Sequence, residues 1–139
     1  MVNCRFTVAI HVLCLLAARH SQPLTSEFIA GSVNTNPVVI RRILAVLRRA
    51  GLVKSHPGVS GGWELVARPE QITLGALYQI VRPGTVFAMH SRQPNVLCPI
   101  GRNIQRGLGA HYQKAQAALE AELDRSTIAD VVKDVLRTK

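Results

Sequence analysis

Acidic and aromatic residues are scarce in this sequence. The 139 residues include 8 Asp and Glu against 17 Lys and Arg, which gives a formal net charge of +9. Such a charge concentrates polyanions around a protein, so nucleic acid or an anionic surface is the expected partner. Aromatic residues make up only 4% of the chain, too few for the stacking platforms that bind single strands. Composition alone does not choose between the remaining partners.

Long hydrophobic runs and cysteine pairs are also missing. No apolar run reaches the roughly 20 residues that cross a bilayer, and the first residues lack a cleavable signal pattern, so we expect a soluble cytoplasmic protein with no membrane contact. The three cysteines, Cys4, Cys14 and Cys98, have no CxxC spacing, which predicts neither a disulfide framework nor a metal site. Cys4 and Cys14 are interpreted as small buried hydrophobic residues within an apolar first helix over residues 2–19.

The most informative stretch predicts a basic helix over Pro37–Ala50. Asn36 is a good N-cap, Pro37 suits the first turn, and Gly51 suits a left-handed C-cap. One face carries the apolar residues Ile40, Ile43, Leu44 and Leu47. The opposite face carries Val38, Arg41, Arg42, Ala45, Arg48 and Arg49. Because residues 41–54 contain five basic residues and no acidic one, this face is expected to bind an external anion.

A β-hairpin is predicted directly after this helix. Residues 52–56 and 63–66 alternate in polarity around a turn rich in Gly, Pro and Ser. A shorter helix capped by Thr25 or Ser26 precedes the basic helix, and Trp63 is expected in the core under the hairpin. The order helix, turn, recognition helix and hairpin is typical of a winged helix-turn-helix that reads duplex DNA. The fold class is therefore mainly α with a small β-hairpin wing.

Candidate DNA contacts follow from this arrangement. Polar side chains near the turn are placed to bind phosphates, namely Thr25, Ser26, Thr35 and Asn36. Three residues are first in line for base edges, namely Val38, Arg41 and Arg42. Further cationic and wing contacts are Arg48, Arg49, Lys54, Ser55, His56 and Ser60.

Two other functions fit parts of the sequence. The segment Gly58–Gly62 matches the G-x-S-x-G pattern of serine hydrolases, with Ser60 as nucleophile. A strand-like run and not a helix follows Ser60, so catalysis is strongly disfavoured and we expect no enzyme. An RNA-binding or protein-interaction module with a winged-helix shape is the second alternative.

The rest of the chain predicts three parts: a DNA-binding domain over residues 1–83, a loop or sensor region over 84–98, and helices over 99–139. The first part ends with a helix over Leu74–Val81 capped by Thr73. From Pro99 a long helix with a narrow apolar seam predicts dimerisation, although packing within one chain is the alternative. Ser126 is expected to cap the last helix, Thr127 to Arg137.

Cys98 is the thiol of most interest. It stands next to Pro99 at the expected start of the long helix, with Arg102 one turn later. A helix N-terminus and a nearby cation both favour a thiolate. A redox-sensing thiol and a merely structural one both remain open.

The segment from Arg42 to Tyr78, with AGLVKSHPGVSGGWELVARPEQITLGALY, resembles the Rrf2 family of winged-helix regulators, and the layout matches over the whole chain. The resemblance implies a homodimer that is held by the long helix and binds a near-palindromic promoter site. We expect it to be a repressor, because occupying a promoter is the simplest action of such a dimer. Two positions depart from the family pattern. Pro57 stands where the wing usually carries an arginine, and Arg41 stands where a glutamate is frequent.

The resemblance also bears on cofactors. Cluster-binding members have three closely spaced cysteines before the dimerisation helix, whereas this chain has only Cys98 there. An iron–sulfur cluster is therefore disfavoured, although His90, His111 or a residue of a second subunit would make an unusual ligand set. The remaining sensors are a thiol switch at Cys98, a small-molecule effector near the hinge between wing and long helix, or none.

Overall fold

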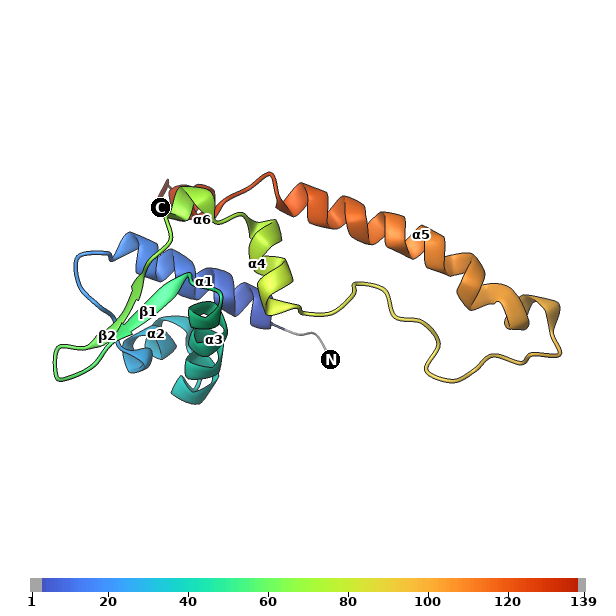
Figure 1. Ribbon diagram of the computed structural model, residues 1–139, viewed down its shortest axis with the longest axis horizontal. Helices are drawn as coiled ribbons and strands as arrows, with labels where there is room; N and C mark the ends of the chain where they lie inside the picture. Colours follow the sequence, from blue (N-terminus) through green and yellow to red (C-terminus); the bar gives the residue numbers. More distant parts are fainter. Residues whose placement is uncertain (1–3, 138–139) are drawn as a thin grey trace.

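The computed structural model describes residues 4–137 and confirms the winged helix-turn-helix (Figure 1). Three helices come first, α1 (Arg5–Ala18), α2 (Ser26–Val33) and α3 (Pro37–Arg49). The antiparallel strands β1 (Val53–His56) and β2 (Gly62–Leu65) follow as the wing. The predicted positions of the recognition helix and both strands are confirmed to within one or two residues.

Helix α1 forms the floor of the core. Its buried side chains, Ala9, Val12, Leu13 and Leu16, share one face, while the other side of the helix is partly open. The prediction that Cys4 is buried is wrong, because this residue precedes the first turn and is exposed, whereas Cys14 is half-buried. The predicted helix start at Val2 lies outside the described residues.

The ends of α2 and α3 are set by local hydrogen bonds. The Thr25 side chain accepts from the Phe28 N–H at 3.0 Å, and Asn36 Oδ1 accepts from the Val38 N–H at 2.9 Å. Helix α3 ends in a Schellman motif, in which Gly51, at φ 80°, donates to the Arg48 carbonyl and Leu52 to that of Leu47. All four predicted core residues of α3 are buried. The caps and the apolar stripe therefore fix which face α3 turns outward.

The wing is anchored by a close backbone approach. Leu24 exchanges backbone hydrogen bonds with Trp63 at 2.7 and 2.9 Å, so a short third segment lies beside β2. Gly62 lies against this segment with φ 151°, and a Cβ there would stand 2.7 Å from the Leu24 carbonyl. Trp63 packs partly buried against the core, as predicted. The glycine at this point of the wing is thus a packing requirement.

A long arm leaves the body after the wing. The 3₁₀ turn η1 (Pro69–Gln71) leads into α4 (Leu74–Val81), which Thr73 caps as predicted. An irregular segment over residues 82–98 then runs out to the start of α5 (Pro99–Leu123), and α5 runs back toward α4 (Figure 1). None of the side chains of α5 is buried. No helix in residues 4–137 is long and apolar enough to cross a membrane.

Helix α6 (Ile128–Arg137) returns to the body and packs on α1 and η1. Ile128 is fully buried in the common core. The prediction that Ser126 caps this helix is wrong: the Thr127 hydroxyl accepts from the Asp130 N–H at 3.1 Å, and the Asp130 carboxylate accepts from the Thr127 N–H at 2.9 Å. The cap moves because the Ser126 carbonyl accepts from Leu74 and Thr127 pairs with Thr73 in a β-bridge.

A polar junction joins the body to the arm. Tyr78 of α4 donates to the Gly84 carbonyl at 2.8 Å and accepts from the Gln116 amide of α5 at 2.7 Å. The side-chain oxygen Oε1 of Gln116 accepts from the Val86 N–H at 3.2 Å. The Tyr78 ring packs edge-on against the ring of Phe6 in α1. One buried tyrosine therefore links α1, α4, the irregular segment and α5.

Candidate nucleic-acid interface

The outward face of α3 is the candidate reading surface. Its N-terminal turn exposes two valines, Val38 at 45% and Val39 at 36%. Exposed aliphatic groups at the start of a recognition helix are suited to contact the methyl group of thymine. Val38 was predicted as a base contact, whereas Val39 was assigned to neither face of the helix.

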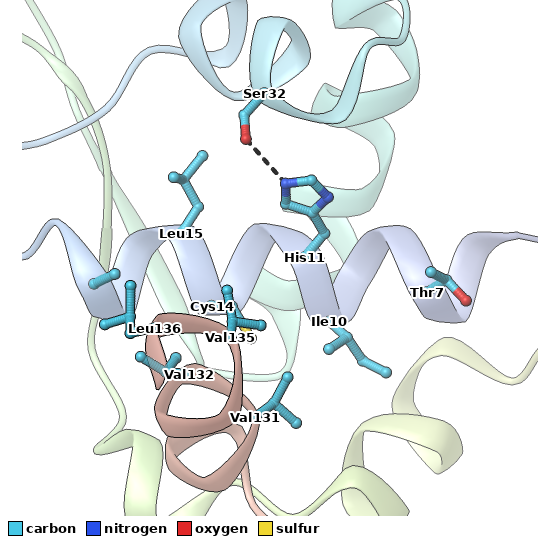
Figure 2. A pocket seen from close by; sticks show the side chains of 11 residues that line it. Thr7, Ile10, His11, Cys14, Leu15, Ser32, Val131, Val132, Val135 and Leu136 are labelled. Atoms are coloured by element: carbon cyan, nitrogen blue, oxygen red, sulfur yellow. Dashed lines mark hydrogen bonds between the residues drawn. The ribbon is translucent and has the colours of Figure 1, made fainter. Parts of the chain in front are cut away.

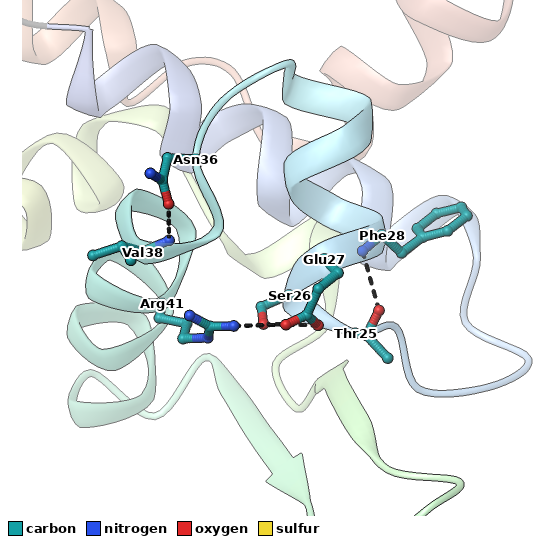
Figure 3. Close-up of polar contacts among 7 residues, drawn as sticks. All are labelled: Thr25, Ser26, Glu27, Phe28, Asn36, Val38 and Arg41. Atoms are coloured by element: carbon teal, nitrogen blue, oxygen red, sulfur yellow. Dashed lines mark hydrogen bonds and ion pairs between the residues drawn. The ribbon is translucent and has the colours of Figure 1, made fainter.

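An ion pair within the helix-turn-helix engages the first arginine of α3. Arg41 Nη2 lies 2.6 Å from Glu27 Oε1 of α2, and both side chains are more than half exposed (Figure 3). The pKa of the Glu27 carboxyl is lowered, first by a hydrogen bond from the Glu27 backbone N–H and then by the hydrogen bond from the Arg41 guanidinium. The expectation that only an external anion would balance this face is therefore wrong for Arg41, because the carboxylate comes from a different helix.

The other arginines of α3 keep their charge uncompensated. Arg42, Arg48 and Arg49 are exposed, and no acidic side chain among residues 4–137 pairs with them. They run from the middle to the end of α3, and the wing follows that end of the helix. Guanidinium groups without an acidic partner attract phosphates and can hydrogen-bond to them. Arg42, Arg48 and Arg49 therefore carry the uncompensated positive charge of α3.

The wing carries a second internal network. Glu64 Oε1 lies 3.0 Å from Lys54 Nζ, and its Oε2 lies 3.2 Å from His56 Nε2. The hydrogen bond from Lys54, and then that from His56, lower the pKa of the Glu64 carboxyl. Lys54 and Glu64 are cross-strand neighbours, so this pairing follows from the hairpin register. The charge of Lys54, a predicted DNA contact, is thus partly neutralised within the wing, and the same carboxylate lies beside His56, another predicted contact.

The side chains predicted to bind phosphates differ in their exposure to solvent. Thr25 and Asn36 are the N-caps of α2 and α3, and Ser55 is exposed on β1. Ser26 is only 8% exposed and its hydroxyl donates to Glu27 at 3.3 Å, so it is the least able to reach a phosphate. Thr35 is half-buried in the turn between the two helices.

Ser60 lies in the exposed turn of the wing, and strand β2 follows it. A nucleophile elbow requires a strand before the serine and a helix after it, and this context is absent at Ser60. The glycines of the motif have another role here, since a Cβ at Gly61 would overlap the His56 carbonyl and one at Gly62 would strike Leu24. Val59, at the tip of the same turn, is fully exposed and was not predicted as a contact.

The sequence analysis identified most basic residues of this surface but did not identify the acidic residues that pair with them. Glu27 and Glu64 were not among the predicted site residues, although the cross-strand position of Glu64 was a usable signal. Phe28, 45% exposed on α2, was also missed; the Arg19 guanidinium lies 5.0 Å from its ring centroid. This cation–π contact joins the end of α1 to α2.

Cys98 is exposed and is the N-cap of α5, as predicted. Its Sγ accepts from the Gly101 N–H at 3.4 Å. Within residues 4–137, no group of three His, Cys, Asp or Glu side chains is arranged to hold a metal ion.

Comparisons with known proteins agree with this geometry. The profile of the family Rrf2, described as an iron-dependent transcriptional regulator, matches residues 2–134. The Bacillus subtilis protein YwnA, named among the HTH-type transcriptional regulators, is 40% identical over 95% of this chain and 97% of its own. A transcriptional regulator from Lactobacillus plantarum has a crystal structure with TM-score 0.81 and 29% identity, covering 97% of this chain and 91% of that one. CymR, the global cysteine regulator of B. subtilis, has the same fold, with TM-score 0.70 and 22% identity over 96% of each chain.

Proposed function

The chain belongs to the Rrf2 family of transcriptional regulators, and from this premise we propose that it is a homodimeric repressor that binds a near-palindromic duplex site. The observation that supports this most is the outward face of α3, where exposed valines precede three uncompensated arginines and the wing lies alongside. Such a surface places base-reading side chains in the major groove while the wing contacts the backbone.

The proposed dimer rests on α5. This helix extends from the body with no buried side chain, yet Ile104, Leu108, Tyr112, Leu119 and Leu123 form a half-exposed apolar seam along it. Pairing two such helices buries both seams and gives the molecule two reading surfaces. Two reading heads related by a two-fold axis require half-sites about one helical turn, roughly 34–36 Å, or a multiple apart.

The experiment begins with genomic fragments that the purified protein selects. Affinity for the selected duplex is measured by fluorescence anisotropy over a salt series, together with an RNA of the same sequence. We expect log affinity to fall with log salt at a slope of about −0.9 per neutralised phosphate, and the duplex to be preferred over RNA. Equal binding to RNA, or no selected motif, would favour an RNA-binding or protein-interaction module. Sedimentation of the protein and of its DNA complex tests the dimer.

We propose that any redox response is mediated by Cys98 and does not require an iron–sulfur cluster. The proposal is supported by the exposed thiol at the N-cap of α5, where Sγ accepts from the Gly101 N–H, because an exposed thiol is open to oxidation. An absorption spectrum of an anaerobic preparation tests the statement that no iron–sulfur cluster is required. Cluster absorption in the visible range would refute that statement.

A further inference from the structure

Polar side chains, and not apolar ones, join the arm to the body where α4 contacts α5. The contacts on the α5 side come from three side chains spaced four residues apart, and hence on one side of the helix: Gln116, Glu120 and Asp124. Three hydrogen-bonded pairs result, which we call the polar ladder: Gln116–Tyr78 at 2.7 Å, Glu120–Gln79 at 2.6 Å and Asp124–Thr73 at 3.4 Å. All of α5 lies within the described residues, and none of its apolar side chains packs against the hydrophobic core. Directional hydrogen bonds therefore set the angle between α5 and the body.

The chain that follows α5 is fixed to the body by backbone hydrogen bonds. The Leu74 N–H donates to the Ser126 carbonyl at 2.9 Å, and the Ile128 N–H donates to the Ile72 carbonyl at 2.8 Å. Helix α6 continues from this point and packs on α1 (Figure 2). The end of α5 is thus a fixed pivot, and the polar ladder determines the direction in which the helix leaves it.

Helix α5 is long enough to turn a small change of angle into a large displacement. Its 25 residues give a length of about 37 Å at a rise of about 1.5 Å per residue. The polar ladder holds only the last third of the helix, and residues 99–115 extend away from the body (Figure 1). A tilt of about 5° at the pivot would move the far end by about 3 Å, which is close to the roughly 3.4 Å rise of one base pair. A small change in the polar ladder is therefore enough to shift a second chain paired to α5 by about one base-pair step.

We propose that the polar ladder determines the half-site spacing that the protein accepts, with Tyr78 and Gln116 as its positioning residues. The inference rests on the proposed homodimer, in which α5 pairs with its copy and the symmetry of the dimer fixes the distance between the two reading surfaces. Neither residue belongs to the reading surface. Both act by holding the angle between α5 and the body.

Tyr78 is the principal member of the polar ladder because its hydroxyl is used in both directions. The side chain is 8% exposed, and its hydroxyl donates to the Gly84 carbonyl while it accepts from the Gln116 amide. Breaking either contact leaves a buried polar group unpaired, so the hydroxyl holds both partners in place. The other two pairs of the polar ladder are exposed, and water competes for their groups.

The test compares duplexes that differ only in spacing. Selected half-sites are placed at the selected spacing and at shorter and longer spacings in steps of one base pair, and a duplex with a single half-site is added. Tyr78→Phe removes the hydroxyl and keeps the ring that packs against Phe6, whereas Gln116→Ala removes the partner on α5, outside the core. Glu122→Gln is the matched control, because Glu122 is also on α5 but pairs with Arg125, just beyond the end of the same helix.

Fluorescence anisotropy should show that wild type and Glu122→Gln favour the selected spacing. In Tyr78→Phe and in Gln116→Ala this preference should fall by about three-fold or more, the effect of losing roughly one net hydrogen bond. Affinity for the single half-site should be the same in all four proteins, because the reading surface is unchanged.

Three results would overturn the inference, and each has a different meaning. If both Tyr78→Phe and Gln116→Ala keep the spacing preference of wild type, other contacts hold the angle of α5. If both weaken binding to every duplex alike, including the single half-site, the two residues only stabilise the body. A wild type that sediments as a monomer and binds the single half-site as tightly as the complete site would refute the proposed homodimer, and the inference with it.

Discussion

The Glu27 carboxylate of α2 lies 2.6 Å from the Arg41 guanidinium of α3, so the two helices of the helix-turn-helix are joined by an ion pair on the reading surface. Arg41 is also a position where the family frequently has a glutamate. The arginine therefore does not simply add a positive charge, because its own chain already provides a carboxylate for it. Glu27 therefore determines whether Arg41 is presented to DNA as a free cation or as part of an oriented ion pair.

Glu27→Gln should release Arg41 and increase non-specific binding. With the carboxylate gone, Arg41 becomes free to contact a phosphate, which steepens the salt slope by about one contact and lowers the ratio of specific to random duplex affinity. Anisotropy with selected and scrambled duplexes measures both quantities. In an Arg41→Ala background the same change should leave the slope unaltered; a slope that still steepens there would contradict this role of the pair.

Arg42→Ala and Arg48→Ala should have different effects on DNA binding: the first should change base preference, and the second should weaken binding to every duplex. Arg42 is a predicted base contact in the first half of α3, so its loss should cost roughly 1–3 kcal/mol of binding and relax preference at one base pair. Arg48, in the last turn of α3, should weaken all duplexes alike and reduce the salt slope by about one. Selection of sites from a random library distinguishes these results. Binding indifferent to both substitutions would refute the assignment of α3 as the recognition helix.

Gly62→Ala should destabilise the protein by more than about 1 kcal/mol, because the residue has φ 151° and its Cβ would stand 2.7 Å from the Leu24 carbonyl. Denaturant unfolding measures the change. Gly31→Ala is the matched control: it lies within α2 with open space around its Cβ, and alanine there should stabilise by roughly 0.5–1 kcal/mol. Equal effects of the two substitutions would show that the approach to Leu24 is not tight.

Glu64→Gln should reduce the pH dependence of stability in the acid range. The pKa of Glu64 is lowered in the folded protein by Lys54 and then His56, so its ion pairs stabilise the wing fully above the pKa of an unfolded glutamate, about 4.3. That contribution is lost as the pH falls through the lowered folded value. Melting temperatures of wild type and variant should therefore differ near neutral pH and converge in acid. Curves that stay parallel would contradict the prediction.

Cys98→Ser should preserve DNA binding and abolish its sensitivity to peroxide. Serine retains the N-cap of α5, so the fold is kept while the oxidisable sulfur is removed. Anisotropy before and after peroxide treatment measures the response. Cys4→Ser, at the other exposed thiol, is the control and should respond like wild type. An unchanged peroxide response in Cys98→Ser would refute the proposed switch.

Local features of the sequence predicted the elements well because the signals act over a few residues. The side chains of Asn36, Thr73 and Cys98 cap α3, α4 and α5 by accepting hydrogen bonds from N–H groups two or three residues later. Pro37 begins α3 with its fixed φ, and the Gly51 N–H bonds to the Arg48 carbonyl at the end of that helix. The cap of α6 was misplaced by one residue because a tertiary contact decided it: the Ser126 carbonyl is engaged by Leu74 of α4.

The sequence by itself determined the basic balance of the protein, its helices and wing, and the apolar stripe that turns the arginines of α3 outward, since charge, periodicity and caps are written in neighbouring residues. Only the tertiary structure decided which of those charges remain free. Glu27 and Arg41 are 14 residues apart and meet because α2 packs on α3, and Lys54 meets Glu64 because the strands pair. Helix α6 likewise packs on α1, more than 100 residues earlier in the sequence, only because the chain folds back onto the body after α5. Contacts between distant residues depend on packing geometry, which no local pattern encodes.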